Sequence, residues 1–144
     1  LGDPGGAKAL VDAVEAGGRP VDVLVNNAGF GDLGHFARAD LAKLVGMVQV
    51  NVTALTELTH RLLPGMIARG SGKILNVGSV AGFQPGPLMA TYYGTKAYVV
   101  SLSQALANEL AGTGVTVTCL CPGPTDTEFA AVAGMQHTKV FSVG

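Results

Sequence analysis

The sequence predicts an α/β fold in which helices cover a parallel sheet. Three short apolar runs, at 21–25, 73–77 and 115–120, are rich in Val, Ile or Leu and are flanked by Gly or Pro, which is typical of buried strands. Two longer segments with helical spacing lie between these runs. The order strand, helix, strand, helix, strand favours a parallel sheet with right-handed crossovers.

Apolar periodicity and terminal glycines define two of the expected helices. Residues 7–16 form the first, which ends at Gly17 and Gly18. Residues 91–110 form the last, which ends in the Gly-rich stretch 112–114. The side of this helix that we expect to be buried consists of Ala97, Leu102, Ala105, Leu106 and Leu110.

The helix between the first two strands begins near Asp40, because Asp is a favourable N-cap residue. Its apolar positions continue to Leu62, and Pro64 with Gly65 is expected to interrupt it. A short final turn is expected over 66–69. The sequence therefore predicts one long helix with a break near its end.

Composition limits the size of the fold and the classes of partner. The chain has 144 residues, 48% of them hydrophobic and 13% charged, with a formal net charge of −1. It can bury one core, so we expect a single domain or part of one. The Lys and Arg residues are scattered, which argues against nucleic acid or an anionic membrane as a partner.

The chain shows neither a membrane-spanning stretch nor the pattern of a signal peptide, so we expect a cytoplasmic protein. It begins at Leu1 rather than Met and ends in small residues. Truncation at one or both ends is therefore expected.

The two cysteines, Cys119 and Cys121, are separated by one residue in a predicted strand, so their side chains share one face. A metal site is disfavoured because no further cysteine, histidine or acidic cluster lies near them in the sequence. We expect two buried thiols in a reducing compartment and no metal site.

A glycine pattern after the first strand imitates a dinucleotide-binding loop. Gly29, Gly31 and Gly34 fit G-x-G-x-x-G, but that loop requires a helix directly after it and a second strand about 20 residues later. Here the next strand starts near Lys73. We expect these glycines instead to permit a tight turn and the close approach of a ligand.

Tyr92 and Lys96 are four residues apart at the start of the last predicted helix. Their Cα atoms differ by about 6 Å along one helix face, so both side chains can reach one point. Ser79 lies thirteen residues before Tyr92, where the second strand ends. Taken singly, these residues would be a solvated helix face and a hydroxyl that caps a loop.

Polar residues also follow the other strands. Asn27, Ala28 and Gly29 follow the first strand, and Asn51 interrupts an apolar helical stripe. Asn51 alone would be a satisfied structural amide or a kink residue. The turn after the third strand contains Pro122 and then the residues Gly123, Thr125 and Thr127.

In this order, these motifs resemble the short-chain dehydrogenase/reductase family. The motifs are N-N-A-G after a strand, Asn in a helix, Ser after a strand, Y-x-x-x-K, and P-G-x-x-x-T after a strand. The resemblance covers residues 1–129, and 130–144 would begin the variable substrate loop. It implies that residues 1–144 are part of one Rossmann-like domain, a doubly wound parallel sheet that is incomplete because the first two βα units are missing.

The resemblance also implies an NAD(P)-dependent oxidoreductase that moves hydride between the cofactor and a ketone or secondary alcohol. The implied catalytic residues are Asn51, Ser79, Tyr92 and Lys96. The residues expected to contact NAD or NADP are Asn27, Ala28, Gly29, Tyr92, Lys96, Gly123, Thr125 and Thr127.

In the expected mechanism, Tyr92 gives a proton to the oxygen that accepts hydride at its carbon. The Lys96 ammonium is expected to lower the pKa of Tyr92, whose ordinary value is about 10. Ser79 would bind the substrate oxygen, and Asn51 would hold a water that links Lys96 to solvent. Tyr93 fits less well, because it lies three residues from Lys96 rather than four.

The loop between Ser79 and Tyr92 is apolar, which predicts a ketone or alcohol with hydrophobic substituents, although these side chains could instead pack the loop itself. The resemblance further implies a homodimer or homotetramer. The alternatives are a non-catalytic nucleotide-binding or scaffold protein of the same fold, and an inactive fragment of the enzyme. The histidines His35, His60 and His137 are expected to lie outside the site.

Overall fold

The computed structural model describes residues 1–123, which contain one three-stranded parallel sheet in the order β1-β2-β3. The strands are β1 (Val23–Asn26), β2 (Gly72–Val77) and β3 (Val115–Leu120). In the register, Leu24 pairs with Ile74, and Ile74 pairs with Val117. The predicted strands and their parallel order are confirmed.

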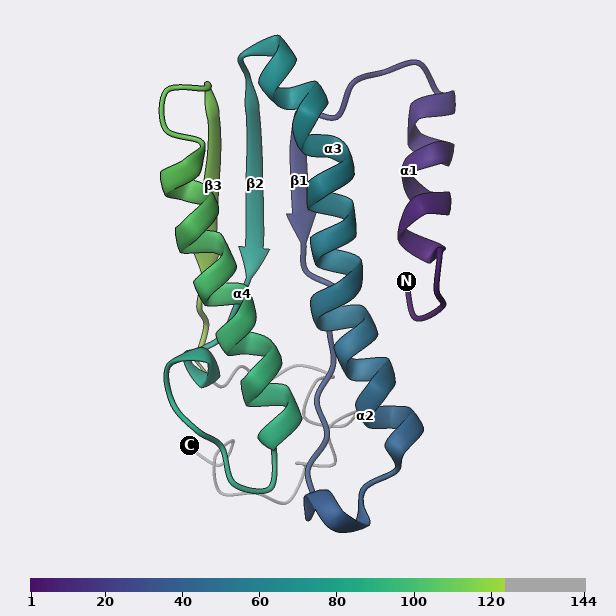
Figure 1. Ribbon diagram of the computed structural model, residues 1–144, viewed down its shortest axis with the longest axis vertical. Helices are drawn as coiled ribbons and strands as arrows, with labels where there is room; N and C mark the ends of the chain where they lie inside the picture. The colour runs from purple at the N-terminus through teal and green to yellow at the C-terminus, as the bar shows by residue number, and fades with distance from the viewer. Residues whose placement is uncertain (124–144) are drawn as a thin grey trace, which may run out of the picture.

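One face of this sheet is covered by helices, which lie in front of the strands in Figure 1. Ile74 and Val115 point to this face and pack in a core cluster with Met66 of α3 (Leu55–Arg69). Alternate side chains point the other way, and there Val23 is 56% and Val25 is 53% exposed. Within the residues that the structure describes, the expected burial of the strands therefore holds for the face under the helices, and the other face is open.

Helix α1 (Gly6–Ala16) ends at Gly17 and lies beside α3, as Figure 1 shows. Contact between the two helices buries small and branched side chains, and Leu24 of β1 packs against the same cluster. The buried members are Ala7, Val11, Ala54 and Leu58.

Helix α4 (Ala90–Glu109) starts and ends within one residue of its predicted bounds. Its buried side agrees with the expected one only near the C-terminal end, where Leu110 is buried and Leu106 packs against the core, whereas Ala97 and Ala105 are exposed. The residues that are buried instead are Thr95, Lys96, Val99, Val100 and Ser103. The three polar side chains on this face all have hydrogen-bond partners, which makes their burial possible. Thr95 bonds to Asn51, Lys96 to Val77 O, and Ser103 to Asn76 and Val99 O.

The long segment between β1 and β2 divides at a different residue from the one expected. Helix α2 (Leu41–Val48) begins at Asp40, whose carboxylate accepts a hydrogen bond from the Ala42 amide at 2.9 Å. The π-helical turn η2 (Gln49–Ala54) follows, and α3 then runs without a break to Gly70. The predicted interruption at Pro64 is therefore wrong, because this proline lies inside α3.

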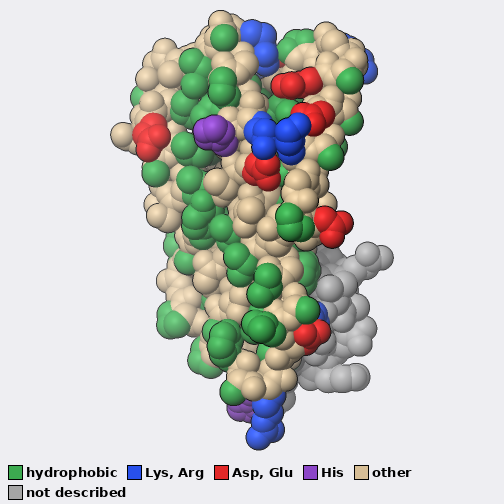
Figure 2. Space-filling view, turned by 45° about the vertical axis from the view of Figure 1, so that its right-hand side comes forward, with side chains coloured by type: hydrophobic (Ala, Val, Ile, Leu, Met, Phe, Trp, Pro, Cys, Tyr) green, Lys and Arg blue, Asp and Glu red, His purple; other side chains and the backbone are tan. Residues whose placement is uncertain are grey.

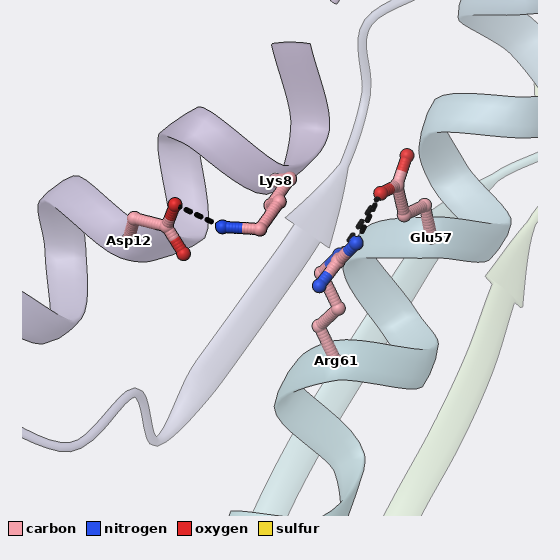
Figure 3. Close-up of polar contacts among 4 residues, drawn as sticks. All are labelled: Lys8, Asp12, Glu57 and Arg61. Carbon is pink, nitrogen blue, oxygen red and sulfur yellow. Dashed lines mark hydrogen bonds and ion pairs between the residues drawn. The ribbon is translucent and has the colours of Figure 1, made fainter. Parts of the chain in front are cut away.

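Two 3-10 turns complete the described structure, η1 (Phe36–Arg38) and η3 (Val80–Phe83). Ion pairs on the outer helix faces join residues four apart, Lys8 with Asp12 on α1 and Glu57 with Arg61 on α3 (Figure 3). Such exposed pairs contribute little to stability.

Hydrophobic side chains reach the surface along the length of the face in Figure 2, and charged side chains gather in its upper part. Within residues 1–123, no helix is both long and apolar enough to cross a membrane.

Candidate functional site

The three parallel strands end at one edge of the sheet, and the candidate residues follow their ends. Backbone hydrogen bonds continue the contact between β2 and β3 beyond the strands: the Gly78 amide donates to Leu120 O at 2.8 Å, and the Val80 amide donates to Pro122 O at 3.1 Å. These bonds fix the segment that contains Ser79 beside the turn after β3. Strand ends of this kind are where open α/β sheets bind ligands.

Ser79 is the N-cap residue of η3, and its Oγ accepts a hydrogen bond from the Ala81 amide at 3.1 Å. Its side chain is also hydrogen-bonded to the side chain of Tyr92, near the start of α4. The predicted proximity of Ser79 and Tyr92 is therefore present, together with the capping role that the loop sequence alone suggests.

Lys96 lies one helical turn after Tyr92, with its Nζ 5.8 Å from the centre of the Tyr92 ring. The ammonium is buried, with 7% of the residue exposed, and donates a hydrogen bond to Val77 O at 2.7 Å. A backbone carbonyl of β2 thus holds Lys96 at the end of the sheet, next to the phenol.

The pKa values of these two groups move in opposite directions. Burial raises the pKa of Tyr92 above 10.0, the Ser79 hydrogen bond offsets part of this rise, and the nearby Tyr93 adds to it. Burial lowers the pKa of Lys96 below 10.5, and the sulfur atoms of Cys119 and Cys121 oppose this fall. The expected lowering of the Tyr92 pKa by Lys96 is wrong, because burial dominates and the shift is upward.

Asn51 is 2% exposed and lies in the π-helical turn η2. Its Oδ1 accepts from the Phe30 amide at 3.1 Å, and its Nδ2 donates to Phe30 O at 2.9 Å and to Thr95 Oγ1 at 3.1 Å. Asn51 is therefore a satisfied buried amide within an irregular turn of helix. Its side chain joins the loop after β1 to α4.

Gly29 lies against this amide. A Cβ at residue 29 would be 3.0 Å from Asn51 Oδ1, which is too close for an undisturbed contact. We expected the glycines of this loop to admit a ligand, but at Gly29 the close neighbour is a side chain of the protein itself. The rejection of a dinucleotide-binding loop is supported, since η1 follows Gly34 and the next α-helix begins only at Leu41.

Thr95 is a functional candidate that the sequence analysis missed. Its Oγ1 donates to Tyr92 O at 2.7 Å and accepts from Asn51, so it links two predicted site residues. The available signal was a threonine three residues after Tyr92, on the same side of the predicted helix. A second missed group is a buried chain of amides, in which Asn26 Nδ2 donates to Asn76 Oδ1 at 2.8 Å and Asn76 Nδ2 donates to Ser103 Oγ at 2.9 Å.

The described residues that we expect to contact the cofactor follow the C-terminal ends of the strands. Asn27, Ala28 and Gly29 are exposed directly after β1. Gly123 is exposed after β3, with open space where a Cβ would be. Thr125 and Thr127, together with the expected substrate loop over 130–144, lie outside the described residues.

The remaining chemical groups do not join the site as ligands or bases. His35 and His60 are exposed, and His137 lies outside the described residues. No group of three or more metal-ligating side chains occurs within residues 1–123. An apolar cavity of about 210 Å³ lies between α1, β1 and α3. Val11, Leu24 and Leu58 line it together with Asn27 and Ala28, whereas Ser79 and Tyr92 do not.

The cysteine side chains share one face, as predicted, with 3.6 Å between their sulfur atoms. Both residues are partly exposed rather than buried, which corrects that part of the prediction.

Comparisons with known proteins agree with this geometry. Residues 1–137 match the family described as short chain dehydrogenase. A ketoacyl reductase from Nostoc sp. is 41% identical over 115 residues, which cover 80% of this chain and 40% of that protein. An oxidoreductase from Bacillus subtilis is 40% identical over 142 residues, covering 94% of this chain and 54% of that protein.

Among solved structures, a short-chain dehydrogenase from Sphingobium yanoikuyae in complex with NADPH is similar, with a TM-score of 0.86 and 36% identity. The match covers 94% of this chain and 53% of that one. The chain thus spans about half the length of its relatives. The match over residues 1–137, with the Rossmann-like parallel sheet, establishes that this chain belongs to the short-chain dehydrogenase/reductase family.

Proposed function

We propose that this chain is the catalytic part of an NAD(P)-dependent oxidoreductase that transfers hydride between a nicotinamide cofactor and a ketone or secondary alcohol. The main support is the hydrogen bond between the side chains of Ser79 and Tyr92, with the Lys96 ammonium 5.8 Å from the Tyr92 ring centre. A hydroxyl, a phenol and a cation at one sheet edge suit a carbonyl oxygen that gains negative charge.

Tyr92 is the proposed general acid and base. A carbonyl carbon that accepts hydride leaves charge on its oxygen, and a phenol within hydrogen-bond reach can supply the proton. Ser79 would donate its hydroxyl hydrogen to the same oxygen and thereby set the distance between substrate and phenol. Because Ser79 already bonds to Tyr92, a substrate oxygen between them would take over an existing contact.

Lys96 and Asn51 would act around the phenol. Burial raises the pKa of Tyr92, which favours the protonated phenol as the proton donor. Transfer of that proton requires a cation that can approach the oxygen, which is the role we assign to Lys96. Asn51 would position the loop after β1 through Phe30. Both N–H groups of its amide already donate, to Phe30 O and Thr95 Oγ1, so the water that would connect Lys96 with solvent would donate to an oxygen of Asn51.

The described residues fit part of a dinucleotide cofactor, which would supply the hydride. The fit rests on the exposed residues after β1 and on the open space at Gly123 after β3, with Tyr92 and Lys96 between them. A phenol and an ammonium are suitable partners for ribose hydroxyls. The glycine loop that binds the phosphates in this fold does not occur in the described residues.

We propose an apolar substrate. The loop before α4 exposes Phe83 and Leu88, and Leu88 O accepts a hydrogen bond from the Gly34 amide at 2.8 Å, which joins this loop to the one after β1. Apolar side chains on joined loops near Tyr92 suit a hydrophobic ketone. Better turnover of aliphatic or aromatic ketones than of polyols would support this substrate class, and the reverse order would contradict it.

We also propose that the protein is a homodimer or homotetramer that associates through the outer faces of α3 and α4. Tyr98 of α4 and Thr56 of α3 share a hydrogen bond of 2.8 Å at this surface, and Ala97, Ser101 and Ala105 of α4 are exposed. Small side chains allow helices of two protomers to approach closely.

The test is hydride transfer by the full-length protein, followed as nicotinamide absorbance with NADH and NADPH across a panel of ketones. Tyr92→Phe keeps the ring and removes only the hydroxyl, and we expect kcat to fall by about 100-fold or more, the range for a lost general acid. Tyr93→Phe is the matched control and should stay within a few-fold of the wild type. Equal activity in Tyr92→Phe, or no activity in either protein, would favour a non-catalytic binding role.

A further inference from the structure

The two cysteines of the chain lie together at the end of β3. Cys119 is in the strand and Cys121 follows its last residue, Leu120. Their sulfur atoms are 3.6 Å apart, and both residues are partly exposed. No step of the proposed hydride transfer uses either thiol.

The backbone geometry permits a covalent bond between these sulfur atoms. Residues two apart in a strand are separated by about 6.6 Å between Cα atoms. This value lies near the upper end of the range of about 4.4–6.8 Å that disulfides span. The Cβ atoms of a disulfide are about 3.5–4.5 Å apart, so the two Cα–Cβ bonds must also tilt toward each other for the bond to form. Cys121 lies just beyond β3, between Leu120 and Pro122, whose carbonyl oxygens accept hydrogen bonds from Gly78 and Val80, so closure depends mainly on side-chain rotation and a small local bend.

Gly78 leaves the space in which the two sulfur atoms can turn toward each other. A Cβ at residue 78 would lie 2.9 Å from Cys119 Sγ and 3.0 Å from Cys121 Sγ. Both distances are shorter than ordinary contacts, so a side chain at this position would push the sulfur atoms out of their present arrangement. Gly78 therefore accommodates the thiol pair.

The surroundings of the pair include two residues of the proposed catalytic site. The backbone of Ser79 is hydrogen-bonded to the Cys121 sulfur, and Lys96 is close enough to interact electrostatically with it. Burial raises the pKa of Cys121, the neighbouring Cys119 adds to this rise, and Ser79 and Lys96 oppose it. The net shift favours the thiol form of Cys121, so the closeness of the two sulfur atoms, and not an acidic thiol, supports their reaction with each other.

We propose that Cys119 and Cys121 form a modification site, a dithiol that a peroxide oxidises to a disulfide within the chain. One thiolate attacks a peroxide oxygen, the O–O bond breaks, and a sulfenic acid and hydroxide form. The second thiol then attacks the sulfenic sulfur, the S–S bond forms, the S–O bond breaks, and water leaves. Two thiols lose two electrons and two protons in total, and one hydrogen peroxide becomes two waters.

Disulfide formation has a structural consequence at Ser79. The two sulfur atoms must come closer together, since a disulfide bond is only about 2.05 Å long. Any part of this movement made by Cys121 would change its contact with the backbone of Ser79, the residue that bonds to Tyr92. The oxidation state of the pair is thereby linked to the geometry of the proposed catalytic site.

The test treats the full-length protein with hydrogen peroxide, blocks remaining thiols with iodoacetamide, and analyses tryptic peptides without reduction. Both cysteines fall in one peptide, because no Lys or Arg occurs between Lys96 and Lys139. We expect this peptide to be unalkylated and lighter than the dithiol form by two hydrogen atoms, and dithiothreitol should restore both alkylations.

Cys119→Ser and Cys121→Ser are the matched controls, and neither can form the bond. In each variant, peroxide should leave a sulfenic acid that dimedone traps. Alkylation of both wild-type thiols after peroxide treatment, their separate conversion to sulfinic acids, or a disulfide between chains on a non-reducing gel would overturn the proposal. The readout does not depend on hydride transfer, so it stands apart from the test of the proposed function.

Discussion

Asn51 holds the backbone of Phe30 with both ends of its side-chain amide. Oδ1 accepts from the Phe30 amide at 3.1 Å, and Nδ2 donates to Phe30 O at 2.9 Å. The two bonds join the π-helical turn between α2 and α3 to the loop after β1. Residues 27–29, which we expect to contact the cofactor, therefore depend on a side chain from another element.

Replacement of Asn51 by Ala should destabilise the protein by about 1–3 kcal/mol, because it leaves two buried backbone groups of Phe30 without partners. Urea unfolding of the full-length protein measures this change. Thr53→Ala, at an exposed position of the same turn, is the control and should change the free energy of unfolding by less than about 0.5 kcal/mol. Equal effects of the two substitutions would show that the Phe30 contacts contribute nothing specific.

Gly29→Ala should lower stability by about 1–3 kcal/mol through overpacking, because the new Cβ would lie 3.0 Å from Asn51 Oδ1. Weaker cofactor binding should accompany this loss, since the Asn51 amide must move. Gly34→Ala in the same loop is the matched control, because no atom lies within 4 Å of its Cβ position. Thermal unfolding and cofactor titration of both variants provide the comparison, and an unchanged Gly29→Ala protein would contradict the prediction.

Lys96 should make the free energy of unfolding depend on pH. Burial lowers its pKa in the folded protein below 10.5, so the unfolded chain binds this proton more tightly. The buried charge therefore costs stability below the folded pKa, and this cost disappears as the pH rises toward 10.5.

The measurement compares the wild type with Lys96→Met in urea at pH values from neutral to about 10. Tyr92 is present in both proteins, so its own titration largely cancels. The wild type should gain stability relative to the variant as the pH rises. A constant difference between the two proteins would mean that the Lys96 pKa is not lowered by folding.

Pro64→Ala should increase stability by about 1–3 kcal/mol. Pro64 lies inside α3 and is exposed, so its removal costs little packing. Alanine restores an amide that can donate to the carbonyl of His60 and removes the clash of the proline ring with the preceding turn. A higher urea midpoint is the expected result, and a lower one would show that the proline has a favourable role in the folded helix.

The sequence predicted those site residues whose relative positions follow from their spacing along one helix or from the order of the strands. Tyr92 and Lys96 are neighbours because four residues make about one turn of helix, and this relation holds wherever the helix packs. Ser79 follows β2, so the parallel order of the strands brings it to the same edge. These relations need only local geometry and topology.

The partners of the same residues could not be found in this way. Lys96 bonds to Val77 O, and Asn51 bonds to Thr95, across elements whose relative position is set by packing. The rise in the Tyr92 pKa likewise comes from burial, which the spacing of Tyr92 and Lys96 does not reveal. The helix was expected to break at Pro64 because proline removes a backbone donor, but packing of the flanking residues keeps α3 continuous.

The buried amides of Asn26 and Asn76 determine how the strands align. The two residues are direct partners in the β1–β2 register, and their side chains bond to each other on the covered face. A slip of one residue would turn one amide to the open face and leave the other buried without its partner. The correct alignment is thereby favoured over its neighbours, and it also sets how far Ser79 lies from Asn27 at the ends of the two strands.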